Sequence, residues 1–176
     1  MSAFLFPTPP NLGLLTQPTE DERRNRRTLA PYVPSNDTVV EAMLDLADLT
    51  PDDTLIDLGC GDGRIVFAAA RRGARARGVD IDPVFVADNR LRASSDPAYA
   101  GVTFVHSDMV AAEIADATVV TCYLLPRSMD VLKPKFETSL RPGTRIVSHA
   151  FTIDGWEPVK MAFPENRLGT VYLWVV

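Results

Sequence analysis

The residues best suited to ligand chemistry lie in one short segment, in which an aspartate precedes three alternating glycines. The segment reads Asp57-Leu58-Gly59-Cys60-Gly61-Asp62-Gly63. Glycine can adopt positive φ and lets the backbone approach a ligand closely. A helix that follows such a loop presents free N–H groups and the positive end of its dipole, which suit a carboxylate or a phosphate. The segment therefore predicts a loop that holds a small polar molecule.

The spacing of these glycines argues against two common nucleotide sites. A dinucleotide fingerprint, G-x-G-x-x-G, would need a glycine at position 64, which is Arg64. A P-loop would need Gly-Lys-Ser/Thr, which does not follow here. A chance glycine turn and a variant nucleotide fold remain as alternatives.

Further acids follow the next two apolar segments. Asp80 lies 23 residues beyond Asp57, and in dinucleotide folds an acid about 20 residues on accepts the ribose hydroxyls. We expect Asp80 to do the same, the alternative being that it only begins a turn. Asp82 precedes Pro83 and is expected to cap a helix. Asp108 either meets the ligand or caps the helix expected after it.

The elements that must position these residues alternate along the chain. Strands are expected at 54–58, 76–81, 102–105, 118–123, 144–148 and 170–176, and helices at 37–47, 65–70, 83–93 and 125–140, the last one bent at Pro134. Strict alternation implies right-handed crossovers and an α/β fold with a parallel sheet covered on both faces. Ligands bind at the carboxyl ends of such strands, where the glycine segment lies.

Two regions differ in composition. Residues 1–36 are rich in proline and are expected to form an arm, either a loosely held tail or a lid over the site, because proline interrupts helices and sheet ladders. Residues 37–176 are expected to form one domain. The whole chain has 176 residues, 46% of them hydrophobic, which suits a single core.

The composition also argues against several function classes. A formal charge of −5 argues against broad binding to nucleic-acid backbones. Two histidines and two cysteines argue against a metal site or a disulfide scaffold. No apolar run is long enough to insert in a membrane, and the first residues lack the basic region of a secretory signal, so a cytoplasmic location is expected. The oligomeric state is left open.

The pattern Asp57-x-Gly59-x-Gly61-x-Gly63 resembles the cofactor loop of class I S-adenosylmethionine (SAM)-dependent methyltransferases. Longer stretches resemble the small single-domain protein-lysine methyltransferases of the archaeal broad-specificity and mitochondrial ATP synthase c-subunit types. These stretches are 31–35 (PYVPS), 57–66 (DLGCGDGRIV), 121–126 (TCYLLP) and 142–149 (PGTRIVSH). The resemblance implies a Rossmann-like α/β fold, a mostly parallel doubly wound sheet with an antiparallel C-terminal strand.

The resemblance also implies a cofactor, SAM, with S-adenosylhomocysteine (SAH) as product. Asp108 would meet the adenine amino group, and Tyr32 would contact the cofactor from the arm. The expected cofactor-binding residues are Tyr32, Asp57, Gly59, Gly61, Gly63, Asp80, Ile81, Asp108, Met109 and Tyr123. Relatives can carry Glu at the ribose position, and both acids accept hydroxyl groups.

The acceptor is expected beside Tyr123, after the fourth strand. Tyr123 would bind the amine or stack on the substrate, or else be a core aromatic, and His149 would be a base or a structural histidine. Methyltransferases that act on the amino groups of nucleic-acid bases often carry Asn/Asp-Pro-Pro-Tyr/Phe at this place. This chain has Tyr123-Leu124-Leu125-Pro126 instead, which argues against a nucleic-acid acceptor. The expected activity is N-methylation of a protein lysine. A small-molecule N- or O-methyltransferase and a non-catalytic SAM-binding module are the alternatives.

Overall fold

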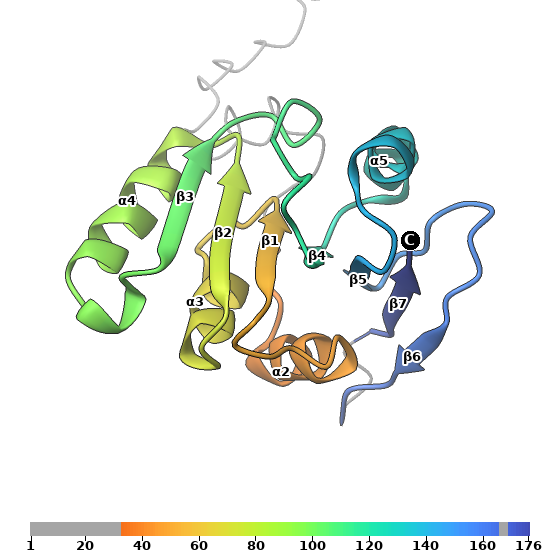
Figure 1. Cartoon of the computed structure of the whole chain (residues 1–176), viewed down its shortest axis with the longest axis horizontal. Helices are drawn as coiled ribbons and strands as arrows, with labels where there is room; N and C mark the ends of the chain where they lie inside the picture. Colours follow the sequence, from red (N-terminus) through yellow and green to blue (C-terminus); the bar gives the residue numbers. More distant parts are fainter. Residues whose placement is uncertain (1–32, 166–168) are drawn as a thin grey trace, which may run out of the picture.

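The computed structural model describes residues 33–165 and 169–176, which form a seven-stranded sheet of order β3-β2-β1-β4-β5-β7-β6 (Figure 1). Its strands are β1 (Thr54–Leu58), β2 (Arg75–Asp80), β3 (Val102–His106), β4 (Val119–Cys122), β5 (Arg145–His149), β6 (Lys160–Ala162) and β7 (Val171–Val175). Strands β1 to β5 pair in parallel, whereas β7 runs antiparallel to both β5 and β6. The predicted Rossmann-like fold with an antiparallel C-terminal strand is confirmed.

Two of the four α-helices in the described part of the chain begin at a side-chain cap. The four helices are α2 (Asp37–Leu46), α3 (Arg64–Arg71), α4 (Pro83–Ser94) and α5 (Pro126–Ser139), with a short 3₁₀ turn, η1 (Pro97–Tyr99). The Asn36 side chain accepts a hydrogen bond from the Thr38 N–H and so caps α2. Asp82 caps α4 in the same way, as predicted, with Pro83 in the first turn.

The core lies on both faces of the sheet. One face packs against α2, α3 and α4, which contribute residues such as Val39, Phe67 and Val86. The other face packs against α5 and the segment 107–118, through residues that include Leu132 and Ile114. Strands β1, β4 and β5 are buried almost throughout, as expected of parallel strands covered on both sides.

The prediction of strict alternation is wrong between β3 and β4. Residues 107–118 contain turns and no helix, so Asp108 caps none. The Asp108 side chain accepts from the Val110 N–H at 2.8 Å, and its carbonyl accepts from the N–H groups of Ala111 and Ala112. These bonds close a local turn. The short strand β6 was not predicted at all, because three residues carry too little periodicity to identify.

Some expectations fall outside the described residues. Tyr32 and nearly all of the predicted arm lie there, so both the arm and its boundary stay predictions. Within residues 33–165 and 169–176, no helix has the length and apolarity that crossing a bilayer would require.

Candidate functional site

The glycine segment forms a tight loop between β1 and α3. Gly59, Gly61 and Gly63 have φ of 78°, 50° and 76°, a region that other residues rarely adopt. The N–H groups of Gly59 and Cys60 both donate to the Val79 carbonyl, at 2.8 and 3.0 Å. A Cβ on Gly59 would lie 3.1 Å from a methyl carbon of Leu124. The loop therefore needs glycine for its backbone conformation and for its close packing.

Asp80 and Asn89 hold the centre of this loop. Asp80 Oδ2 accepts from the Gly61 N–H at 2.7 Å, and Oδ1 accepts from the Asp82 N–H at 2.8 Å. The buried Asn89 side chain on α4 donates to the Gly61 carbonyl at 2.7 Å. Each carboxylate oxygen of Asp80 keeps a further lone pair for a ligand. Asp80 was predicted from the sequence and Asn89 was not, because the only sign of Asn89 in the sequence is a polar residue on the buried side of a helix.

Asp57 lies beneath the loop and is almost completely buried. Desolvation raises its pKa to about 7, and the nearby carboxylates of Asp80 and Asp62 also raise it. The Thr121 hydroxyl, which donates to Asp57 Oδ1 at 2.8 Å, opposes the rise. A cationic ligand placed near Asp57 would favour the ionised carboxylate.

The next strand end carries the other predicted cofactor residues. The Ser107 N–H donates to the Asp80 carbonyl at 3.0 Å, which joins the end of β3 to that of β2. Asp108 and Ile81 are exposed, and Met109 is half-buried against the core. These side chains border Asp80 along the carboxyl edge of the sheet.

Tyr123 directly follows β4, and His149 is the last residue of β5. Leu58 pairs with Cys122, and Cys122 pairs with Ser148, so the loops after β1, β4 and β5 are neighbours. The rings of Tyr123 and His149 lie 4.1 Å apart between centroids. The structure thus gathers the predicted glycines, the two aspartates and these aromatic residues at one edge of the sheet.

Two other kinds of chemistry, metal binding and attack by a cysteine thiol, can be checked against the residues that the structure describes. Residues 33–165 and 169–176 hold no group of three or more His, Cys, Asp or Glu placed to bind a metal. Cys60 and Cys122 are buried thiols, and burial raises the pKa of both, that of Cys122 to about 12. A neutral buried thiol is a poor nucleophile.

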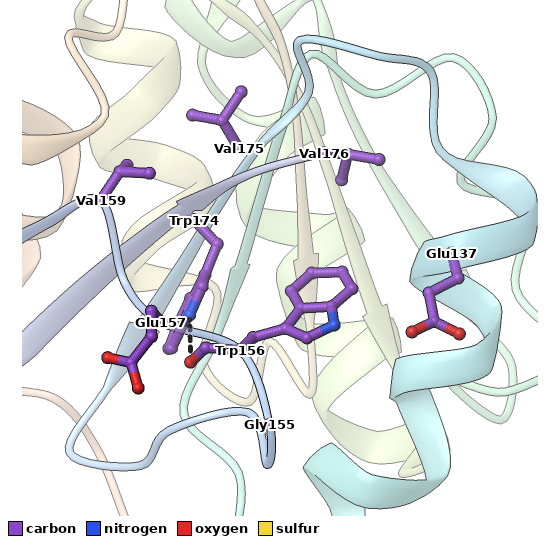
Figure 2. A pocket seen from close by; sticks show the side chains of 8 residues that line it. All are labelled: Glu137, Gly155, Trp156, Glu157, Val159, Trp174, Val175 and Val176. Atoms are coloured by element: carbon purple, nitrogen blue, oxygen red, sulfur yellow. Dashed lines mark hydrogen bonds between the residues drawn. The ribbon is translucent and has the colours of Figure 1, made fainter.

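A separate pocket of about 510 Å³ lies between α5, the segment 155–159 and the end of β7 (Figure 2). Trp156 and Trp174 line it, and the Trp174 indole N–H donates to the Trp156 carbonyl at 3.1 Å. Its residues Val175 and Val176 adjoin the start of β5, because Val175 pairs with Arg145. The pocket therefore lies away from the carboxyl edge and contains none of the predicted site residues.

Comparisons with known proteins agree on the type of fold and cofactor. Residues 57–160 match the model of the ANTKMT methyltransferase domain. A protein-lysine N-methyltransferase of Saccharolobus islandicus is 40% identical over 150 residues, which cover 83% of this chain and 93% of that protein. The adenine nucleotide translocase lysine N-methyltransferase of Mus musculus is 35% identical, and the match covers 76% of this chain but only 58% of the mouse protein.

A solved structure is also similar along most of its length. It is described as an RNA methyltransferase from Salinibacter ruber in complex with SAH. It is 44% identical, with a TM-score of 0.77, and the match covers 81% of this chain and 93% of that one.

Proposed function

Because the chain belongs to the family of the ANTKMT methyltransferase domain, we propose that this SAM-dependent methyltransferase modifies lysine side chains of a protein. The observation that carries the proposal is the identity to the archaeal lysine enzyme, which spans 93% of that protein. The geometry supports it, since the glycine loop and the aromatic residues after β4 and β5 meet at one edge of the sheet.

The residues at this edge fit a nucleoside that carries a cation. The positive-φ glycines let the backbone lie close to a ligand, and Asp80 presents a carboxylate for ribose hydroxyls. The Asp57 carboxyl, whose pKa burial raises to about 7, can lose its proton when a positive charge lies nearby. We assign the adenine side to Asp108, Met109 and Ile81, and the methionine side to the glycine loop and Tyr123. Tyr32 remains a proposed contact from outside the described residues.

When bound, SAM supplies a methyl group activated by its sulfonium, so the protein has mainly to orient and deprotonate the acceptor. With a reference pKa of ~10.4, keeping a lysine neutral at pH 7 costs about 4.6 kcal/mol. Half-buried aromatic surface at Tyr123 would lower this cost, because a partly dry environment disfavours the ammonium form. The site can therefore work without a strong dedicated base.

The test is to incubate the protein with SAM carrying a labelled methyl group and three kinds of acceptor. These are a synthetic library of lysine peptides, total RNA, and a panel of small amines and hydroxyl compounds. We expect label on peptides, located by mass spectrometry on the lysine Nζ. The Gly61→Val variant serves as the control for cofactor-dependent transfer.

The other two kinds of acceptor show which results would count against the proposal. RNA is included because the Salinibacter structure bears that description, although the net charge of −5 disfavours binding to a phosphate backbone. Label only on RNA or only on small molecules would replace lysine as the acceptor. Binding of SAM without transfer to any acceptor would favour a non-catalytic module.

A further inference from the structure

Four distant parts of the chain meet at the ends of β4 and β5. Ser35 Oγ lies 3.2 Å from His149 Nδ1, and both residues are buried. The Arg64 guanidinium donates to the Ser35 carbonyl, and the His149 ring packs against Tyr123. Each of these residues comes from one of the four stretches that resemble lysine methyltransferases. Their contacts join the glycine loop to the aromatic residues after β4 and β5.

Three rings form what we call the aromatic wall: Tyr123, His149 and Phe151. The Tyr123 centroid lies 4.1 Å from that of His149 and 6.2 Å from that of Phe151, with interplanar angles of 37° and 19°. His149 is only 5% exposed, whereas Tyr123 and Phe151 are half-buried. The ring surface that a ligand can reach therefore belongs mainly to Tyr123 and Phe151.

An unusual turn holds Phe151 in this wall. Ala150 has φ of 67°, which is strained for a residue with a Cβ. The Phe151 N–H donates to the His149 carbonyl at 2.9 Å, and the Ser148 hydroxyl donates to the Phe151 carbonyl at 2.7 Å. Strain of this kind clusters at ligand sites, which directs attention to the side chain that the turn presents.

The back of the wall is equally fixed. A Cβ on Gly169 would lie 2.7 Å from His149 Nε2, so the chain at 169 packs directly on the imidazole. On the cofactor side, Arg64 Nε donates to Asp62 Oδ1 at 3.0 Å within the glycine loop. The His149 ring is thus held between Gly169, Ser35 and Tyr123, in a fixed place relative to the loop.

We propose that Tyr123 and Phe151 bind the side chain of the acceptor lysine, and that Ser35 and His149 are positioning residues that hold this wall beside the glycine loop. The inference rests on the proposed function and names its acceptor site. A lysine stem packs well along the apolar faces of such rings, and the partly dry surface that they form disfavours the ammonium form of its amine. Tyr123 adjoins Leu124, whose methyl carbon lies 3.1 Å from the place that a Cβ on Gly59 would take, so an amine on the wall would lie next to the glycine loop.

The first test compares Phe151→Ala with Phe163→Ala, a control that removes a phenylalanine 74% exposed outside the wall. Both are assayed with the lysine peptide that the wild type methylates best. We expect Phe151→Ala to raise the KM for the peptide about tenfold and to leave the Kd for SAH within about twofold. Phe163→Ala should change neither. An unchanged peptide KM in Phe151→Ala would overturn the proposal.

The second test separates positioning from simple stability. Ser35→Ala should impair peptide methylation with little change in the Kd for SAH, and Ser35→Thr, which keeps the hydroxyl, should restore it. Equal losses in Ser35→Ala and Ser35→Thr, or no loss in either, would contradict the positioning role. If the wild type methylates no lysine peptide, the proposed function itself fails. If it does but the variants behave like the wild type, only the aromatic wall is wrong.

Discussion

The carboxyl edge of the sheet has two halves, a proposed cofactor half and a proposed acceptor half, which differ in the chemical groups that they present. The cofactor half, at the ends of β1, β2 and β3, relies on backbone groups and carboxylates, such as the bond from the Gly61 N–H to Asp80. The proposed acceptor half, at the ends of β4 and β5, presents the half-buried rings of Tyr123 and Phe151 above the buried side chain of Leu124. If the proposed assignment is right, the first half specifies one ligand by directional bonds, whereas the second offers a surface on which many lysine-bearing segments can pack.

This difference predicts how each half responds to change. Directional bonds to a fixed loop tolerate no displacement, so substitutions in the cofactor half should abolish or sharply weaken binding of SAM. Packing against a ring loses contact area gradually, so substitutions in the acceptor half should change the acceptor KM by smaller factors.

The largest effect is expected for Gly61→Val. Gly61 has φ of 50°, and both its N–H and its carbonyl are bonded to side chains, so a β-branched residue would displace the loop. We expect calorimetry to detect no binding of SAH. Gly101→Ala is the matched control, because a Cβ there meets nothing within 4 Å. Tight binding by a folded Gly61→Val variant would mean that the loop has been misassigned.

The next effect is expected for Asp80→Ala. The substitution removes the proposed ribose acceptor and one support of the loop, and should weaken binding of SAH by roughly 1.5–3 kcal/mol. Asp80→Glu should retain more of the affinity, because it keeps the carboxylate. Asp96→Ala, which alters only the cap of η1, is the control. Equal affinity for Asp80→Ala and the wild type would refute the ribose assignment.

A smaller effect is expected from pH, through Asp57. Burial raises the pKa of the Asp57 carboxyl to about 7 in the folded protein, well above the usual range of an aspartate. Above pH 7 a cationic ligand meets a carboxylate that is already ionised. Below pH 7 the ligand must first displace a proton. Affinity for SAM should therefore rise roughly tenfold between pH 6 and pH 8, and Asp57→Asn should flatten this rise. A wild-type profile as flat as that of Asp57→Asn would contradict the assignment.

The raised pKa of Asp57 also predicts how stability depends on pH. As pH rises, stability should fall, whereas affinity for SAM should rise. The folded state retains the Asp57 proton at pH values where the unfolded chain has lost it, so the free energy of unfolding should fall as pH rises from about 4 to about 7. Asp57→Asn should lose that part of the slope. Urea unfolding of both proteins across this range measures the difference.

The smallest effect is expected for Tyr123→Phe. The ring that packs on His149 is kept and only the hydroxyl is lost, so kcat/KM for the peptide should stay within about threefold if the ring is what matters. A loss of a hundredfold or more would place the Tyr123 hydroxyl in the reaction, as an acceptor of the amine proton. Either result sharpens the account of the acceptor half.

The cofactor half was largely readable from the sequence because its signals are local. The alternating glycines, the acid at the end of β2 and the Asp82 cap are all recognised within a few residues. The loop after β1, the strands β1 to β3 and the cap of α4 were predicted, and the role of these residues in binding the cofactor stays a prediction. The acceptor half depends on contacts between distant residues. The bond between Ser35 and His149 spans 114 positions, and that between Asp57 and Thr121 spans 64. No local pattern indicates either bond.

The missed features have the same origin. Phe151 follows a strand without any motif, and its importance comes from the positive φ of Ala150 and from the neighbouring ring of Tyr123. Asn89 supports the loop through its bond to the Gly61 carbonyl. That bond depends on how α4 packs against the loop, which no local pattern indicates. The helix expected after Asp108 is absent, because the N–H groups that follow donate to the Asp108 side chain and carbonyl and so close a turn.

A crystal structure of the protein with SAH tests the central claim most directly. It should place the ribose hydroxyls on the Asp80 carboxylate, the adenine near Asp108 and Met109, and the thioether sulfur beside Tyr123. Saturating SAH that leaves this edge of the sheet empty, or that binds only in the pocket between α5 and β7, would contradict the account.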